Sequence, residues 1–417
     1  MKKFNFFICL FALVLISCGD DDDAMVPQCV NPINLEESNI TFDSVALSWD
    51  DLNNTNSFTV EYGLSGFEQG SGTTINSTEN SLLLTGLTAN TTYDYYVQTS
   101  CDVSNVSLWS EVKSFTTLAS PVIPQFLTNL SDLNLFSGNL ADLTPTPYAF
   151  EYELSTPLFS DYAHKHRFIA LPIGTTLGYE DDGLPIFPDN TVIAKTFFYN
   201  NDERNLSLGR KIIETRLLIK IEGSWETADY KWNDAQTDAV LDFDGSVVPI
   251  TWIDAEGDIN NLNYEIPSNT DCFTCHQTFN EITPIGPRLR TLNFVKNGVN
   301  QLQQFIDENY ITGISSSDNV SALPVWTDDS YTLEQRARAY FDIQCAHCHI
   351  KGGFCETQSP LRLDFESSFD DSKIFDQRFS IQSRISNFIP GFSMPFIGTT
   401  TIHDEGVELL QAYLDTL

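Results

Sequence analysis

The chain has 417 residues, enough for roughly two to four domains, and its 41% hydrophobic content with 30 Phe supports buried cores. Lys and Arg number 22 against 57 Asp and Glu, which gives a formal net charge of −35. Nucleic-acid binding depends on cationic residues that neutralise phosphates, so this balance excludes nucleic acid as the main partner. It also argues against attraction to anionic lipid surfaces. The nine Cys and six His carry most of the chemical information that remains.

The first 17 residues have the pattern of an export signal. Two lysines precede an apolar run over residues 6–16, which is shorter than the roughly 20 residues that a membrane-spanning helix needs. The run ends in Leu-Ile-Ser-Cys-Gly, which resembles a bacterial lipobox and implies that Cys18 is the acylated first residue of the mature protein. An ordinary cleaved signal is the alternative.

Residues 18–28 are predicted to be an acidic tether, with four consecutive Asp at 20–23. The tag is similar to one that accompanies surface display of lipoproteins in a large group of Gram-negative bacteria. We expect an outer-membrane lipoprotein on the periplasmic or cell-surface side, held to the membrane by its lipid anchor alone. Its later cysteines would then lie in an oxidising compartment.

Residues 29–118 are predicted to be all-β, because short runs of β-branched and aromatic residues alternate with turn clusters. The predicted strands are Val45–Trp49, Phe58–Tyr62, Ser81–Leu84, Tyr93–Ser100 and Val112–Thr116. Trp49 and the stretch Leu-Thr-Ala-Asn-Thr-Thr-Tyr ending at Tyr93 resemble a fibronectin type III domain. The resemblance implies that the Tyr93 hydroxyl bonds back to the preceding loop. We expect Cys29 and Cys101 to form a disulfide, with free thiols as the alternative, in a domain that serves as a spacer or docking module.

A second β-rich domain is predicted over residues 121–266. Its strand-like runs, separated by Gly and Pro turns, are Phe168–Leu171, Ala194–Tyr199, Thr215–Ile221 and Val247–Ile253. His164 and His166 are separated by one residue, so an extended backbone directs both rings to one face. Such a pair suits a metal ion, and the alternative is two polar residues at a domain seam.

Two Cys-x-x-Cys-His motifs, at residues 272–276 and 345–349, form the strongest chemical signal. This spacing is the attachment signature of c-type heme, in which two thiols bond one porphyrin edge and the adjacent His ligates the iron. The expected attachment points are Cys272, Cys275, Cys345 and Cys348, and the expected proximal ligands are His276 and His349. A structural zinc site, which would need a fourth ligand, and a thioredoxin-like thiol pair are the alternatives.

The second motif lies between two segments with helical patterns. Residues 332–344 are predicted to form an amphipathic helix, and another is expected after His403, with Val407, Leu410 and Leu414 on one side. Between these helices Met394 lies in a loop rich in Pro and Gly. Residues 325–417 therefore resemble a mainly α class I cytochrome c domain, which implies that His349 and Met394 are its axial ligands. A Met that only fills a gap in the core is the alternative.

The first motif lies in a segment, residues 267–320, that lacks a preceding helix but has a helical pattern near residues 299–310. Together with residues 157–161, 230–238 and the second motif, it resembles a family of envelope diheme c-type cytochromes, with the likeness covering residues 125–417. The resemblance implies electron transfer between redox donor and acceptor proteins of the envelope. The whole chain is thus predicted to be multidomain, with an all-β N-terminal half and a mainly α C-terminal domain.

The second axial ligand of the first heme follows by elimination. Met1 leaves with the signal, Met25 lies in the tether, and Met394 belongs to the second heme, so a His is expected. We discount His347, which lies inside the second motif, and His403, which begins the terminal helix. That leaves His164 and His166. We favour His166, because its neighbours Lys165 and Arg167 suit heme propionates.

These features predict a lipid-anchored electron carrier with two covalently bound c-type hemes and no assigned catalytic residue. A diheme peroxidase, with one heme feeding electrons to an open second heme, is the first alternative. A surface binding or adhesion protein is the second. Cys355 has no assigned role.

Overall fold

The computed structural model describes residues 28–417, so the predicted signal, Cys18 and almost all of the acidic tether lie outside the described residues. The chain divides into two compact units, with the division between Leu118 and Ala119. This division agrees with the boundary predicted after residue 118. Within residues 28–417, every helix is too short or too polar to cross a membrane.

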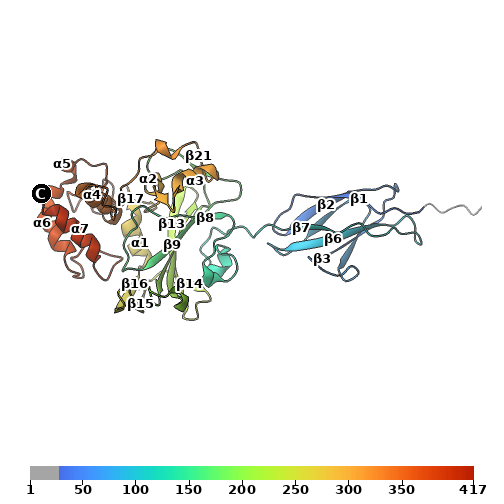
Figure 1. Ribbon diagram of the computed structural model, residues 1–417, viewed down its shortest axis with the longest axis horizontal. Helices are drawn as coiled ribbons and strands as arrows, with labels where there is room; N and C mark the ends of the chain where they lie inside the picture. The colour runs from blue at the N-terminus through green and yellow to red at the C-terminus, as the bar shows by residue number, and fades with distance from the viewer. Residues whose placement is uncertain (1–27) are drawn as a thin grey trace, which may run out of the picture. The chain divides into compact units, whose positions relative to one another are not determined.

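The first unit is a sandwich of two antiparallel sheets, drawn in blue and cyan in Figure 1. One sheet has the strand order β1-β2-β5 and the other has the order β4-β3-β6-β7. The strands are β1 (Ile33–Ser38), β2 (Ser44–Asp50), β3 (Phe58–Leu64), β4 (Thr73–Ser77), β5 (Ser81–Thr85), β6 (Thr92–Thr99) and β7 (Lys113–Thr116). Alternate residues of these strands point inward, where Trp49 packs edge-on against Phe58 at 5.3 Å between ring centroids.

Two predictions for this unit are confirmed. Cys29 and Cys101 form a disulfide that closes a sequence separation of 72 residues. The Tyr93 hydroxyl accepts a hydrogen bond from the backbone N–H of Thr88 at 3.0 Å, and the Tyr93 ring stacks on Phe115. The unit therefore has the expected fibronectin type III-like fold, with the tyrosine tying the loop before β6 to the sandwich.

The second unit is built on a six-stranded antiparallel sheet with the order β14-β13-β12-β11-β9-β8. Its strands are β8 (Ala149–Glu151), β9 (His164–Ala170), β11 (Val192–Asn200), β12 (Arg210–Ile221), β13 (Ser224–Trp232) and β14 (Ala239–Asp242). A separate hairpin is formed by β15 (Ser246–Ile253) and β16 (Ile259–Ile266). Three further pairs of two-residue strands are β10 (Leu177–Gly178) with β21 (Ile311–Thr312), β17 (Gln277–Thr278) with β18 (Glu281–Ile282), and β19 (Val295–Lys296) with β20 (Val299–Asn300).

The two faces of the six-stranded sheet carry different cores. Phe168, Ala194 and Leu217 pack with the short 3-10 segment Leu130–Leu133 on one face. Their neighbours Ile169, Ile193 and Leu218 pack on the other face against α2 (Leu289–Leu292) and α3 (Gln301–Asp307). The two helices belong to the segment 267–320 that the sequence set apart from the β-rich domain. Because that segment shares a core with the strands, the two form one unit.

The C-terminal part of the second unit is helical. Its helices are α4 (Leu333–Gln344), α5 (Phe369–Ser372), α6 (Ile374–Ile385) and α7 (Asp404–Leu414), drawn in brown and red in Figure 1. A capping box between Thr332 and Gln335 begins α4. Helix α7 packs against α4 and α6, and the shared core includes Phe341, Ile381 and Leu410. The two predicted helices are present, and α6 is an addition that the sequence did not predict.

Candidate functional site

The first Cys-x-x-Cys-His motif lies on α1 (Asn269–His276), a helix begun by a capping box between Ser268 and Asp271. Helix α1 packs against β13, and the buried Cys272 thiol lies 3.8 Å from the Asp229 carboxylate. At the end of the helix, Nδ1 of His276 lies 2.9 Å from the carbonyl oxygen of Thr283. A carbonyl only accepts hydrogen bonds, so Nδ1 carries the proton and Nε2 is left as a ligand atom. Burial lowers the pKa of His276 to about 3, which keeps the ring neutral.

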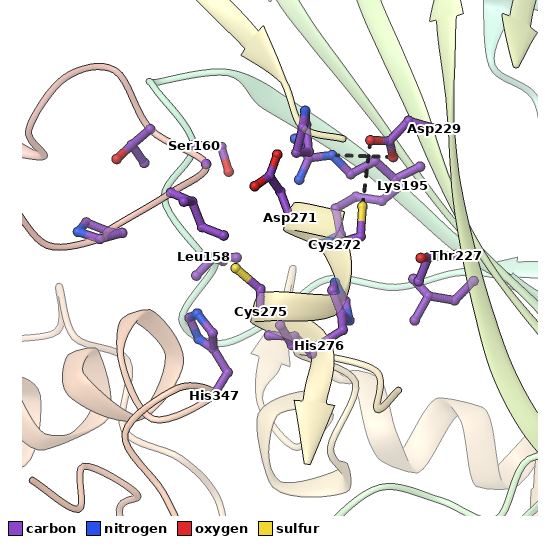
Figure 2. A pocket seen from close by; sticks show the side chains of 18 of the residues that line it. Leu158, Ser160, Lys195, Thr227, Asp229, Asp271, Cys272, Cys275, His276 and His347 are labelled. Atoms are coloured by element: carbon purple, nitrogen blue, oxygen red, sulfur yellow. Dashed lines mark hydrogen bonds and ion pairs between the residues drawn. The ribbon is translucent and has the colours of Figure 1, made fainter. Parts of the chain in front are cut away.

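The sheet behind α1 carries buried charges. Lys195 on β11 is 9% exposed, and Arg216 on β12 donates to Glu214 at 2.6 Å. Burial lowers the pKa of Lys195 to about 7, and the nearby Arg167 adds to this effect. Figure 2 shows Lys195 and Asp229 beside Cys272. The face that α1 covers therefore carries buried charges of both signs as well as apolar residues.

A cavity of about 70 Å³, here called the first-motif cavity, lies beside α1 and this sheet face. Cys272, Cys275 and His276 line it together with Lys195 and Arg216 (Figure 2). Its volume lies well below the roughly 300–1,000 Å³ of ordinary small-molecule sites. A group of porphyrin size needs more space than this cavity alone provides.

The second motif follows directly after α4, whose last turn leads into Cys345. His349 is 9% exposed, and burial lowers its pKa to about 4. Its Nδ1 is buried and has no hydrogen-bond partner among residues 28–417. Buried polar atoms are nearly always paired, so this orphaned nitrogen marks a place where chemistry is expected.

A cavity of about 390 Å³, here called the second-motif cavity, lies beside the second motif. Cys345, Cys348, His349 and Met394 all line it, so the structure brings the four predicted residues of this site around one space. The backbone N–H of Met394 donates to the carbonyl of Arg384 near the end of α6, which fixes the loop against that helix. The remaining wall is largely apolar and includes Phe341, Leu361, Leu363, Ile381 and Ile385.

The two motifs lie side by side. One donor atom each from Cys275, His347 and Cys348 lies within 4.8 Å of the others. The chain after each motif also pairs with the other: Phe279 donates its N–H to Gly352 at 2.8 Å, and Thr278 forms a β-bridge with Gly353.

Burial and hydrogen bonding divide the cysteines into two kinds. Burial raises the pKa values of Cys272 and Cys345 to about 12, so both are protonated thiols at neutral pH. A hydrogen bond from Cys348 lowers the pKa of Cys275 to about 5, and another lowers that of Cys355 to about 7. Cys355, which had no assigned role, thus lies beside Cys348 and also lines the second-motif cavity.

The structure does not bring His166 to the first motif. On β9, His164 and His166 alternate with Lys165 and Arg167, and successive strand residues point to opposite faces of the sheet. Arg167 pairs in register with Lys195, which faces α1, so both His rings point to the other face. There Nε2 of His166 lies 2.6 Å from Glu151, and Nε2 of His164 lies 2.7 Å from Glu203. The prediction for His166 requires its ring and the cations of Lys165 and Arg167 to lie on one face of the sheet, whereas alternation along β9 puts them on opposite faces.

Residues 155–162, here called the strap, hold the helical part against the sheet. Gln344 at the end of α4 accepts from the Phe159 N–H and donates to the Pro157 carbonyl, both at 2.8 Å. The buried Asp161 carboxylate accepts from the backbone N–H and the hydroxyl of Thr400 and from the N–H of Thr401. The strap therefore fixes the loop that leads to α7 and the helix that leads to the second motif.

Sequence reasoning missed Lys195, Arg216 and Thr283 as residues of this site. The sequence does indicate a special role for Lys195, because this lysine interrupts the apolar run Val-Ile-Ala-Lys-Thr-Phe-Phe-Tyr. A lysine in the middle of a buried strand is rarely there without a charged partner or a ligand. Thr283 contributes only its carbonyl oxygen, which no sequence pattern reveals.

The family model that matches this chain lies within the first unit. The family model described as "Purple acid Phosphatase, N-terminal domain" matches residues 30–117. A comparison with curated proteins found no match. Among solved structures, a computationally redesigned β-sandwich protein is 26% identical, covering 21% of this chain and 95% of its own, with a TM-score of 0.19.

The FN5 domain of Drosophila Lar is 15% identical, covering 22% of this chain and 98% of its own, with a TM-score of 0.19. The fn3 domain of human contactin 1 is 17% identical, covering 25% of this chain and 94% of its own, with a TM-score of 0.20.

Proposed function

We propose that this protein is a lipid-anchored diheme c-type cytochrome that transfers electrons in the bacterial envelope. The observation that carries the proposal is the second-motif cavity, where one space of about 390 Å³ is lined by both cysteines, the histidine and the distant Met394. A chance Met in a loop has no reason to meet the motif across an apolar cavity. Heme bound there supplies a one-electron change of its iron.

The residues of the chain fit distinct tasks in this proposal. Cys345 and Cys348 would hold the second heme covalently, with His349 and Met394 as its axial ligands. Cys272, Cys275 and His276 would hold the first, and the Thr283 carbonyl fixes the tautomer of His276. Lys195 and Arg216 line the first-motif cavity and would face the propionates, which are carboxylates and attract cations.

The proposal also assigns a membrane attachment and partners. Cys18 would carry the lipid anchor at the outer membrane, and the partners would be redox donor and acceptor proteins of the envelope. The peroxidase alternative requires an iron with an open position and acid–base residues beside it. The adhesion alternative gives no reason for a Met-lined cavity beside a heme motif.

The match to a purple acid phosphatase N-terminal domain does not carry phosphatase chemistry to this chain. The match ends at residue 117 and covers a segment that contains no His at all. We assign this sandwich the role of a spacer or docking module.

A second candidate is a metal centre, favoured by the close approach of Cys275, His347 and Cys348. Cys355 lies beside Cys348 but outside this close group of three, and it would supply the fourth ligand that zinc prefers. Against it, Cys272 and Cys345 are left as protonated thiols with no task, whereas thioether formation uses both. The two candidates exclude each other, because a sulfur bonded to heme is no longer a thiolate ligand.

Heme and zinc content distinguish the candidates. The full chain, produced in a host that matures c-type cytochromes, should contain two hemes by pyridine hemochrome absorbance and no stoichiometric zinc. The variant with Cys272→Ser and Cys275→Ser should contain one heme, and so should the variant with Cys345→Ser and Cys348→Ser. One zinc per chain and no covalent heme would overturn the proposal.

A further inference from the structure

The six histidines of the chain can be sorted by their partners, and one remains unexplained. His276 and His349 belong to the Cys-x-x-Cys-His motifs. His164 and His166 are bound to glutamates on the sheet face away from α1. His403 is enclosed, because its Nδ1 bonds the Tyr340 hydroxyl at 2.8 Å and its ring stacks on Phe159 at 4.4 Å. Among residues 28–417, Nδ1 of His347 has no hydrogen-bond partner, and its ring interacts with the Cys275 thiol.

His347 comes from the second motif and lies where the two motifs meet. It lines the second-motif cavity, the first-motif cavity and a neighbouring cavity of about 140 Å³ that Cys275 and His276 also line. In Figure 2 its ring points toward the Cys275 thiol. Its Nδ1 is buried and finds no hydrogen-bond partner in the part of the chain that the structure describes. A buried, unpaired imidazole nitrogen beside a heme motif is a candidate iron ligand.

The fold fixes His347 in this place from both sides. Before it, Gln344 is held by its two hydrogen bonds to the strap. After it, Gly352 and Gly353 pair with the chain that follows the first motif. These contacts restrain the backbone on both sides of His347, which fixes the position of its Cα relative to the first motif.

We propose that His347 is the second axial ligand of the first heme, an inference that rests on the proposed diheme function. Both axial positions of that heme would then be imidazoles, which favours a lower potential than the His/Met pair of the second heme. His347 and Cys348 are adjacent in sequence, so one peptide bond would join the ligand of one heme to the attachment point of the other. The second motif would then bind its own heme and, through His347, supply the second axial ligand of the first heme.

The test uses the full chain from a heme-maturing host, with heme content and spin state measured separately. The wild type should show two low-spin hemes by electron paramagnetic resonance of the oxidised protein. His347→Ala should keep two hemes but convert one to a high-spin form that binds carbon monoxide, and added imidazole should restore the low-spin signal. His166→Ala, the matched control, should leave both signals unchanged.

A second variant covers the case in which His347→Ala fails to mature. His347→Met retains a ligand atom and should raise the potential of one heme while the other stays constant in a redox titration. If His347→Ala leaves both hemes low-spin, or if the wild type already has a high-spin first heme, the ligand assignment fails and the diheme function stands. If the wild type holds fewer than two hemes, or one zinc, the proposed function itself fails.

Discussion

At the scale of single residues, local surroundings decide which atoms are available for chemistry. Burial keeps His276 and His349 neutral, with pKa values of about 3 and 4, and a neutral imidazole is the form that ligates a metal. Cys272 and Cys345 are held as thiols by the same burial.

Met394 provides a prediction at this scale. Met394→Leu keeps the side-chain volume nearly constant but removes the thioether sulfur, so the second heme should lose one ligand. We expect a high-spin heme that binds carbon monoxide, with a potential lower by on the order of 0.1 V within the roughly 0.8 V range that axial ligands cover. Optical spectra and a redox titration measure both effects. Ile381→Leu, which alters the same cavity wall without a donor atom, is the control. Unchanged spectra in Met394→Leu would show that this Met only fills space.

Tyr93 provides a second prediction, independent of heme. Tyr93→Phe leaves the Thr88 N–H without its acceptor, so local stability of the sandwich should fall by about 1–2 kcal/mol. Hydrogen exchange on peptides from residues 29–118 reports the loss. Tyr96→Phe, on the opposite side of the same strand and packed on Phe67, should change little. Equal effects of the two variants would contradict the role of the Tyr93 hydroxyl.

At the scale of secondary-structure elements, the strands were predictable because their β-branched and aromatic runs are bounded by turn residues. Helix α6 was not, because its buried residues Ile374, Ile381 and Ile385 share one face but are separated on that face by the polar residues at 377 and 378. Helix α1 also has a weak apolar pattern, because Cys272 is its only buried residue.

The positions of the histidines depend on pairing between strands and helices that are far apart in sequence, and the sequence alone does not predict this pairing. Alternation along β9 was enough to show that His164 and His166 share a face, but not which face α1 covers. That depends on the register of β9 with β11 and on the packing of α1 against β13, which involve residues far apart in sequence. The same long-range pairing brings His347 to the first motif, a contact that its position in the second motif conceals.

The strap gives a prediction at this scale. Asp161 has a φ of +51°, which Asn also tolerates, so Asp161→Asn preserves the backbone and changes one acceptor oxygen into a donor. The amide would then face the N–H and hydroxyl donors of Thr400 and Thr401, at an expected cost of about 2 kcal/mol. Hydrogen exchange should increase over residues 399–403. Glu408→Gln, an exposed acid on α7, should have no such effect. Unchanged exchange in Asp161→Asn would mean that the strap is not held by this carboxylate.

At the scale of the whole molecule, the chemistry is confined to one of two units. The first unit is a disulfide-closed sandwich without histidine, and the second contains both motifs with the first-motif and second-motif cavities. The sequence predicted the boundary near residue 118 because the strand pattern ends there. It did not predict that the segment 267–320 would complete the core of the β-rich domain, which ties the first motif to the sheet and its buried cations.

Peptide mapping by mass spectrometry tests the central claim most directly, because it locates each covalent bond. The full chain from a heme-maturing host would be digested and its peptides measured intact. The account predicts one heme on the peptide that contains residues 272–276 and one on the peptide that contains residues 345–349, with Cys355 unmodified by heme. Either motif recovered with two free thiols from the mature protein would contradict it.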